Sequence, residues 1–433
     1  MPHGPDTANE PGAPRQGAPS SLWRNRDFRT FLGGQGVSAF GDSISFTALP
    51  LLVIALTGSG VAMGIVGVLT TLPDLFFGLP AGALADRWDR RRMMLYADLG
   101  RAALTALIPL SFIVGIDTMA VVLLVTAPIN LLRVIFMAGF TAAVPNLVAR
   151  EQIGRATGVV EGLFSLTFIV GPAIAGVLSH VVGPGPTIAL DAASFLFSAG
   201  ALTLVRKRLQ ADRRDDAERP HIVSDIVEGV RYIAGQRTLR TVIAFWGVAS
   251  IASAPLVPAV IFYLAIDRGQ SSDVVGTVVS AYGVGYFIGA ILAGRSAATR
   301  LGAGMLVGNA ASGLALIAFA TAGTVPLELA ASAAVGVTGS VVLISYLTLR
   351  ATIPPDELLG RVGSTARTIS LGLQPIGLFA GGILLDAIGG RMTILIIAGA
   401  ILAVTGLFAF SPTLRGAVAG TGQRTRERAP SRC

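Results

Sequence analysis

The sequence has few charged residues for its length. Asp, Glu, Lys and Arg account for 13% of its 433 residues, whereas a soluble globular chain carries roughly 25%. Hydrophobic residues account for 52%, and the mean hydropathy is +0.70. This balance is typical of a polytopic membrane protein. The net charge of +8 does not indicate a nucleic-acid partner, because the basic residues lie in short loops and tails.

Cysteine and histidine are also scarce. Cys433 is the only cysteine, so neither an intrachain disulfide nor a cysteine-based metal site can form. His3, His180 and His221 are far apart in the sequence, and we expect no metal site and no cofactor. The sequence also lacks the GxxxxGKS or GxxxxGKT pattern of an ATP-binding loop. A membrane-embedded enzyme, or a receptor that does not transport, is therefore a remote alternative to a transporter driven by an ion gradient.

Long apolar runs make up most of the sequence. A helix needs about 20 predominantly apolar residues to cross the hydrocarbon core of a bilayer. Runs of this length, separated by charged residues or by Gly and Pro, predict twelve membrane spans: 30–56, 61–85, 93–115, 119–144, 156–181, 186–205, 240–266, 274–297, 302–321, 326–349, 363–387 and 392–411.

Arginine is distributed unevenly among the loops. It is frequent in both tails and in the loops at 86–92, 150–155, 206–240, 295–300 and 350–367. It is rare in the alternate loops, where Arg268 and Arg391 are the exceptions. Because cytoplasmic loops are enriched in Lys and Arg, we expect a multi-pass protein of the cell membrane with both termini in the cytoplasm.

The spans group into two halves that repeat. We expect a disordered tail at 1–22, a six-helix bundle at 23–205, a cytoplasmic linker at 206–239, a second six-helix bundle at 240–411 and a disordered tail at 412–433. Apolar residues at 222, 226, 230 and 233 predict an amphipathic helix within the linker. Gly154-Arg155 recurs 206 residues later as Gly360-Arg361. The predicted fold is an all-α membrane protein of two pseudo-symmetric six-helix bundles, the plan of a transporter with its site between the halves.

One charged stretch, GALADRWDRRR at residues 82–92, ends an apolar run and directly precedes the next. It resembles motif A of the major facilitator superfamily, in the form found in the drug-efflux and siderophore-exporter branch. The wider superfamily usually has Gly where Asp89 stands. The resemblance implies a conformational latch formed by Gly82, Asp86, Arg87, Arg90 and Arg91. The corresponding segment of the second half has Ala298 in place of the acid, and a generic Arg-rich loop is the alternative.

The fifth span has a second signature. Gly158, Gly171, Pro172 and Gly176 are spaced as in motif C of the same superfamily, although Thr167 and Ala175 replace two of its usual glycines. The resemblance implies a helix that seals one end of the transport path and is associated with exporters. Ordinary packing of small residues against a neighbouring helix is the alternative.

Ionisable residues within the spans are candidates for proton coupling, since each costs about 2.5–3.5 kcal/mol at the centre of a membrane. Asp42 lies near the middle of the first span and Arg133 near the middle of the fourth, and these spans line the cavity in the superfamily. We expect Asp42 to carry the proton, Arg133 to stabilise its ionised form, and Glu161 to be a second candidate. A static buried salt bridge is the alternative. Asp98 and Arg101, spaced i,i+3 near the cytoplasmic end of the third span, are expected to have a structural role, paired with each other or with the loop at Arg90–Arg92.

The spans contain few polar side chains, which suits hydrophobic or amphipathic ligands better than sugars. The candidates for the cavity wall are Asp74, Phe245, Trp246, Tyr282 and Tyr346, although aromatic residues of spans also face lipid or the core. The predicted function is export of hydrophobic or amphipathic small molecules, drugs among them, by a monomer that exchanges them for protons through alternating access. A dedicated exporter of one metabolite, such as a siderophore, is the alternative.

Overall fold

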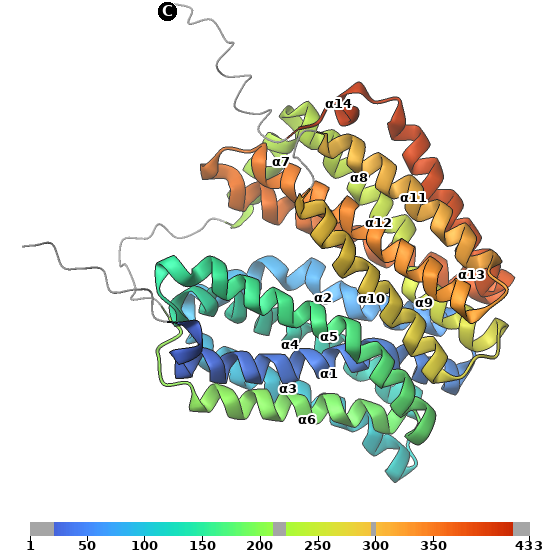
Figure 1. The fold of residues 1–433 in the computed structure, drawn as a ribbon. Helices are drawn as coiled ribbons and strands as arrows, with labels where there is room; N and C mark the ends of the chain where they lie inside the picture. The colour runs from blue at the N-terminus through green and yellow to red at the C-terminus, as the bar shows by residue number, and fades with distance from the viewer. Residues whose placement is uncertain (1–20, 211–221, 296–299, 419–433) are drawn as a thin grey trace, which may run out of the picture.

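The computed structural model describes residues 21–210, 222–295 and 300–418, without the side chains of residues 79, 83, 86, 222–226 and 356. Nearly all of the described residues are helical, so the expected all-α membrane fold is confirmed. Helices α1 to α6 form a first half and helices α7 to α14 a second half, and the two halves converge at one end (Figure 1).

The helices have the following bounds. The first half contains α1 (Arg26–Thr57), α2 (Gly60–Arg87), α3 (Arg90–Val114), α4 (Thr118–Leu147), α5 (Ile153–Val182) and α6 (Pro184–Leu204). The second half contains α7 (Ile222–Gly235), α8 (Arg237–Ser253), α9 (Leu256–Phe262), α10 (Ser272–Arg295), α11 (Leu301–Thr321), α12 (Val325–Thr352), α13 (Leu359–Ala409) and α14 (Pro412–Arg415). Short 3-10 helices at Leu22–Arg24, Arg150–Gln152 and Asp356–Leu358 and a π-helix at Tyr263–Asp267 complete the described secondary structure.

Polar side chains mark the starts of the first four helices. Asn25, Ser59, Asp89 and Asp117 precede α1, α2, α3 and α4, and each accepts a hydrogen bond from a backbone N–H in the first turn of its helix. Such a cap satisfies an N–H that has no partner inside the helix. Asp89, which departs from the usual glycine of motif A, thus fixes where α3 begins.

Eleven helical segments among the described residues are long and apolar enough to cross a membrane. The sequence predicts twelve, and the difference arises in α13, which contains the last two predicted spans within 51 residues. A continuous helix of that size would be about 76 Å long, more than twice the thickness of the hydrocarbon core. Gly389 interrupts α13 with a φ of 79° and a ψ of 170°, values that are not helical.

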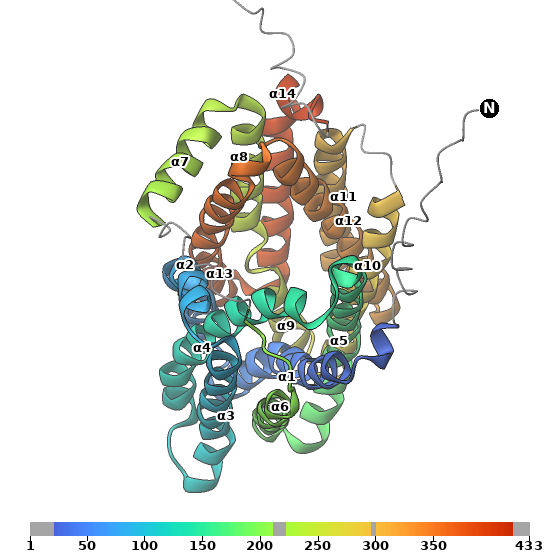
Figure 2. The same ribbon diagram turned by 90° about the vertical axis from the view of Figure 1, so that its left-hand side faces the viewer.

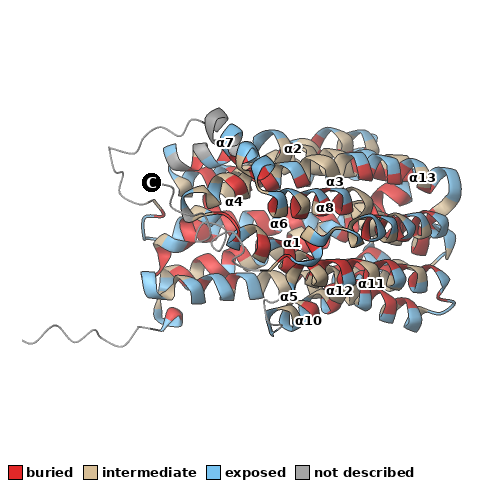
Figure 3. Ribbon diagram, turned by 90° about the horizontal axis from the view of Figure 1, so that it is seen from above, coloured by how far each residue is buried: buried red, intermediate tan, exposed pale blue. Residues whose placement is uncertain are grey.

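The outer surface is apolar along the helices. Large side chains such as Leu124, Leu407 and Phe410 are exposed there, and Figure 3 shows exposed residues along the outer faces of many helices, with buried residues between them. In a membrane these side chains face lipid tails, which do not penalise apolar surface.

The buried apolar residues form three clusters. One cluster contains residues of both halves, among them Leu51, Met63, Val275 and Leu385. The second contains only residues between 22 and 209, and the third only residues between 233 and 417. The halves therefore share a core at one end, which we call the closed end, and have separate cores at the other, which we call the terminal end because the linker and both tails begin there.

Two helix crossings join the halves at the closed end. α5 crosses α10 where a Cβ on Gly176 would lie 2.9 Å from the Cα of Gly276, and α2 crosses α13 where a Cβ on Gly64 would lie 3.2 Å from the Cα of Gly382. Only residues without a side chain permit backbones to approach so closely. Figure 2 shows α2 beside α13 and α5 beside α10.

A carboxylate supplements the α2–α13 crossing. Asp386 of α13 accepts hydrogen bonds from the Ser59 hydroxyl at 2.7 Å and from the backbone N–H of Val61 at 3.0 Å, and also from the N–H of Gly60. One half of the molecule therefore caps the first turn of a helix in the other half.

The described chain extends further into both predicted tails than expected. Leu22, placed in the N-terminal tail by the sequence, is buried against the first half. In the predicted C-terminal tail, Leu414 and Ala417 are buried against the second half, and Ala417 accepts a hydrogen bond from the N–H of Gly302 at 3.1 Å. Burial of these apolar side chains holds both segments in place. The rest of the two predicted tails, 1–20 and 419–433, lies outside the described residues.

The linker contains α7, which packs on the start of α13. Glu228 forms an ion pair with Arg361 of α13, and a Cβ on Gly229 would meet the Arg361 carbonyl oxygen at 2.8 Å. Ile233 is buried, whereas Val227 and Val230 are exposed. The side chains at 222 and 226, part of the predicted amphipathic pattern, lie outside the described residues.

Candidate functional site

A cavity of about 500 Å³ lies within the first half. Residues of α1 to α6 line it, and most of the lining is apolar. Its charged side chains are Asp42, Arg101, Arg133 and Asp191. The described lining of this cavity comes from the first half alone, although four of the five predicted wall residues belong to the second half.

Asp42 lies on the cavity wall with its side chain 43% exposed. Its carboxylate forms an ion pair with Arg101 of α3, not with Arg133 as the sequence predicts. Asp42 and Arg133 do line the same cavity, but α3 places a guanidinium directly beside Asp42. Arg101 is 2% exposed, and at 1.5 Å per residue it lies about 16 Å from the start of α3, near the middle of that 25-residue helix.

Arg101 also contacts a second acid and two aromatic rings, those of Phe136 and Phe195. Its Nη1 atom lies 3.6 Å from Asp98 Oδ1, so the predicted i,i+3 pair exists but is part of a larger group. Its guanidinium also lies 3.8 Å from the centre of the Phe195 ring, a favourable arrangement for a cation. Asp191 of α6 is within electrostatic range of both Asp42 and Arg101. We call Asp42, Asp98, Arg101 and Asp191 the charge cluster.

Asp191 reaches the charge cluster through a tight helix crossing. The Ser45 hydroxyl donates a hydrogen bond of 2.5 Å to Asp191 Oδ2. A Cβ on Gly41 would lie 2.6 Å from Asp191 Oδ1 and 2.1 Å from the Ser194 hydroxyl oxygen. The absence of a side chain at position 41 therefore lets α6 approach α1 and places Asp191 beside Asp42.

Arg133 belongs to a second group of charges. Its guanidinium forms an ion pair with Asp74 of α2 and donates a hydrogen bond to the Asn130 side chain at 3.2 Å. Asp74 also lies 3.8 Å from Arg367 of α13, which connects the two halves. Asp74 was predicted to line the cavity. It is instead the counter-ion of Arg133, is 13% exposed and is not among the described lining residues.

Glu161 does not join either group. It is exposed on α5, about one turn before the cavity residue Phe164, and is not part of the cavity wall. Among the described residues, no group of three or more His, Cys, Asp or Glu side chains has an arrangement that could hold a metal ion.

Three of the predicted aromatic cavity residues are packed inside the second half. Phe245 is fully buried and contacts Phe408 edge to face, with ring centres 5.4 Å apart. Trp246 stacks on the buried ring of Tyr346 at 4.6 Å. These contacts place Phe245 and Tyr346 in the core and hold Trp246 against it.

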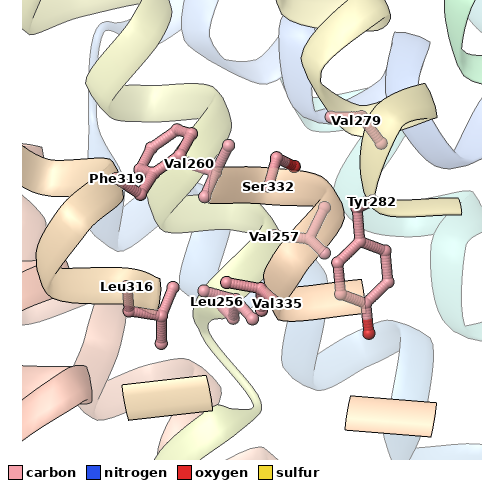
Figure 4. Close-up of a pocket in the computed structure, with 9 residues that line it drawn as sticks. All are labelled: Leu256, Val257, Val260, Val279, Tyr282, Leu316, Phe319, Ser332 and Val335. Carbon is pink, nitrogen blue, oxygen red and sulfur yellow. The ribbon is translucent and has the colours of Figure 1, made fainter. Parts of the chain in front are cut away.

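The fourth predicted aromatic, Tyr282, lies between the halves. Its ring is 6.4 Å from Phe168 of α5, which in turn is 5.5 Å from Phe46 of α1. Phe46 and Phe168 both line the cavity. Tyr282 also borders a small pocket of about 20 Å³, drawn in Figure 4, whose other labelled residues are nearly all apolar. An aromatic path therefore leads from the cavity toward the second half.

The motif A arginines bind backbone carbonyls at the terminal end. Arg90 donates hydrogen bonds to the carbonyls of Ala85 at 3.2 Å, Ala142 at 2.9 Å and Leu209 at 3.3 Å, and Arg91 donates to Lys207 at 2.8 Å. Cations stabilise carbonyl groups at helix C-termini. Arg87 is exposed, and a Cβ on Gly82 would meet no atom within 4 Å. The side chain of Asp86 and the counterpart residue Ala298 lie outside the described residues.

The motif C residues contact two different helices. A Cβ on Gly171 would lie 2.2 Å from the Ser43 hydroxyl oxygen of α1, whereas a Cβ on Gly176 would lie 2.4 Å from the Ser272 carbonyl oxygen at the start of α10. The carbonyl of Pro172 also faces α10, at Gly276. Gly158, nearer the terminal end, has open space beside it.

The sequence did not predict that Arg101, Asp98 and Asp191 take part in the site. The arginines at 90–92 favoured a position for Asp98 and Arg101 at the end of a span, and Asp191 has no charged residue near it in the sequence to suggest a partner. The usable signal was the presence of three charges inside segments that are otherwise apolar.

Comparison with known proteins identifies the family. A model of the transmembrane secretion effector family matches residues 18–427. The chain is 30% identical over 383 residues to the multidrug efflux pump Tap of Mycolicibacterium fortuitum, across 87% of this chain and 93% of that protein. It is 32% identical over 392 residues to the multidrug efflux pump Tap of Mycobacterium tuberculosis, across 88% and 92%.

The fold also matches a solved transporter. The crystal structure of the nucleoside transporter NupG superimposes with a TM-score of 0.72 at 12% sequence identity, over 89% of this chain and 98% of that one. At this identity the likeness concerns the fold alone. The resemblance carried by motifs A and C is thus confirmed, and the chain belongs to the transmembrane secretion effector family of the major facilitator superfamily.

Proposed function

We propose that this chain exports hydrophobic or amphipathic small molecules, drugs among them, in exchange for protons. The drug-efflux part is supported by the two multidrug efflux pumps to which it is similar over nearly its whole length. A mostly apolar cavity of about 500 Å³ is of the size that small molecules occupy. The observation that carries the proton part is Asp42, a carboxylate open to this cavity and paired with a buried guanidinium.

Asp42 is the proposed main proton carrier, and Arg101 replaces Arg133 as its direct partner. While Asp42 is ionised, its attraction to Arg101 links α1 to α3, and both of these helices pack on α6. A proton that binds the Asp42 carboxylate removes this attraction, and α1 is then free to move relative to α3. Arg133 adds a positive charge elsewhere on the cavity wall, and Glu161 remains a second candidate carrier.

The proposed arrangement in the membrane follows from the loops and from α13. If α13 crosses twice, before and after Gly389, the chain has twelve spans in two pseudo-symmetric six-helix bundles, divided by the linker at 206–239. With both termini in the cytoplasm, the closed end is external and the cavity communicates with the cytoplasm. Motif A, including Asp86, serves as a latch at the cytoplasmic end, and the transporter works as a monomer in the cell membrane.

Proton antiport can be tested with purified protein in liposomes that have an acidic lumen and contain a pH-sensitive dye. A panel of unrelated amphipathic drugs, added outside, should each make the lumen more alkaline as protons leave. Asp42→Asn should slow this response at least about tenfold, the effect of losing roughly 1.4 kcal/mol of coupling.

Asp117→Asn is the matched control, since Asp117 only caps the exposed start of α4 and Asn caps nearly as well. An undiminished response of Asp42→Asn would remove Asp42 from the mechanism. A response to one compound alone would favour the dedicated exporter, and no response to any compound would contradict proton antiport.

A further inference from the structure

The charge cluster contains more negative than positive charge. Asp42 of α1, Asp98 of α3 and Asp191 of α6 supply three carboxylates, and Arg101 supplies one guanidinium. No other charged residue lines this side of the cavity among the described residues, because α5 contributes only Phe164, Thr167 and Phe168. Across the cavity, Arg133 of α4 is already paired with Asp74 of α2.

Two excess negative charges would be costly in this location. A single carboxylate at mid-membrane costs about 2.5–3.5 kcal/mol on insertion scales, and burial without a partner costs more. Asp98 is completely buried, and its described charged partner is Arg101, the same guanidinium that pairs with Asp42. The cluster therefore requires additional positive charge, in the form of protons or of a cation in the cavity.

The three acids differ in their access to the cavity and in whether they already have a counter-ion. Asp98 is 0% exposed and does not line the cavity. Asp42 already has Arg101 as its counter-ion. Asp191 lines the cavity although it is only 4% exposed, and its described direct partners are the hydroxyl groups of Ser45 and Ser194, which carry no charge. Asp191 is thus the acid that has access to the cavity and lacks a cation of its own.

We propose that Asp191 is a second proton-carrying carboxylate, which shares Arg101 with Asp42 and exchanges its proton for a lipophilic organic cation. When the cation enters the cavity, the Asp191 O–H bond breaks and the proton passes to water, so one positive charge replaces another. When the cation leaves, a proton from water restores the bond. The apolar and aromatic wall, which includes Phe46 and Phe168, suits a lipophilic cation. This assignment rests on the proposed function as a proton-coupled exporter.

The test measures binding of tetraphenylphosphonium to the purified full chain between pH 5 and pH 9. This probe has no proton to lose, so any pH dependence of its affinity comes from the protein. A protonated Asp191 lacks the negative charge that attracts the probe, and affinity should therefore fall as the pH falls, by about tenfold per pH unit below the midpoint for one displaced proton. Triphenylphosphine oxide, which is neutral, should bind with little pH dependence.

The informative variants change the carboxylate and its hydrogen bond. Asp191→Asn should weaken the pH dependence and leave only the part that comes from Asp42, Asp191→Glu should keep the full dependence, and Asp117→Asn should behave as wild type. If Asp191→Asn does not fold, Ser45→Ala leaves the carboxylate in place but removes the hydroxyl that donates to it. Loss of that donor disfavours the ionised form, so the midpoint should move to higher pH.

The outcomes separate the two proposals. Suppose that the affinity of the wild type for the probe depends on pH. If Asp191→Asn then shows the same pH profile, or Ser45→Ala shows the same midpoint, Asp191 is not a carrier, and antiport through Asp42 is unaffected. A wild type whose affinity for the cation does not depend on pH, and which moves no protons in liposomes, overturns the proton antiport itself. A weaker pH dependence in Asp191→Asn than in both the wild type and Asp117→Asn establishes Asp191 as a carrier.

Discussion

At the scale of single residues, Arg101 organises the site. It contacts acids from two helices and the ring of Phe195, and it is almost completely buried. The i,i+3 spacing correctly predicted its pair with Asp98. It could not predict the pair with Asp42, because that pair depends on how α1 and α3 are placed by the packing of the helices. Arg133 was matched to the wrong acid for the same reason, since α2 brings Asp74 to it.

A residue-scale prediction concerns Gly41, whose lack of a side chain leaves room for Asp191. Gly41→Ala places a methyl group 2.1 Å from the Ser194 hydroxyl oxygen and 2.6 Å from Asp191 Oδ1. Such overpacking costs about 1–3 kcal/mol, so the variant should melt at lower temperature in detergent. Gly33→Ala on the same helix meets nothing within 4 Å and should melt at or above the wild-type temperature. Equal melting temperatures for the two variants would contradict this geometry.

At the scale of helices, the motif C residues of α5 divide their contacts between the two halves. Gly171 packs against α1 inside the first half, whereas Gly176 packs against α10 in the second half. The α5–α10 contact at Gly176 has to separate if the closed end opens. The residues of motif A, in contrast, hold together segments of the first half through Arg90 and Arg91.

The corresponding prediction is that Gly176→Ala shifts the molecule away from the closed state. Its Cβ would lie 2.4 Å from the Ser272 carbonyl oxygen, and strain of about 1–3 kcal/mol present only in the closed state shifts an equilibrium about 5- to 150-fold. Labelling of Thr126→Cys, a cavity position, with a membrane-impermeant maleimide added outside should accelerate accordingly. The background is Cys433→Ser, because Cys433 is the only native cysteine.

Gly158→Ala is the matched control for this labelling experiment. It lies on the same helix, where a Cβ meets nothing within 4 Å, and it should leave the labelling rate unchanged. Unaltered labelling in Gly176→Ala would show that the α5–α10 crossing does not govern access from outside.

At the scale of the whole molecule, the two halves share one hydrophobic core at the closed end and keep separate cores at the terminal end. Alternating access requires the shared core to come apart while the separate cores stay intact. The cap that Asp386 provides for α2 lies in the shared region, so it should break each time the closed end opens.

A disulfide at this cap should stop transport. Ser59→Cys with Asp386→Cys replaces two side chains that are 2.7 Å apart across the halves, within reach of a disulfide after small adjustments. Oxidation should abolish drug transport, and a reductant should restore it. The control pair, Ser111→Cys with Thr118→Cys, joins side chains 2.9 Å apart inside the first half and should leave transport unaffected by oxidation. Continued transport by the oxidised Ser59–Asp386 pair would show that the closed end does not open there.

The sequence alone determined the features that depend on local composition. Apolar runs of sufficient length predicted the membrane spans, although α13 joins the last two, and the spacing of Gly171, Pro172 and Gly176 predicted a helix that packs closely. Asp42 and Arg133 were identified as charges inside spans because their neighbours in the sequence are apolar, which makes each charge conspicuous and costly.

Only the tertiary structure decided which of these charges meet. Ion pairing requires atoms within a few ångströms, and residues far apart in sequence reach that distance only when helices cross at positions such as Gly41, Gly176 and Gly276. The crossing of α1 and α6 at Gly41 brought Asp191 beside Asp42. The crossing of α5 and α10 at Gly176 and Gly276 joined the two halves at the closed end. The sequence could list the charged residues of the spans, but the packing of α1, α3 and α6 selected the ones that form the site.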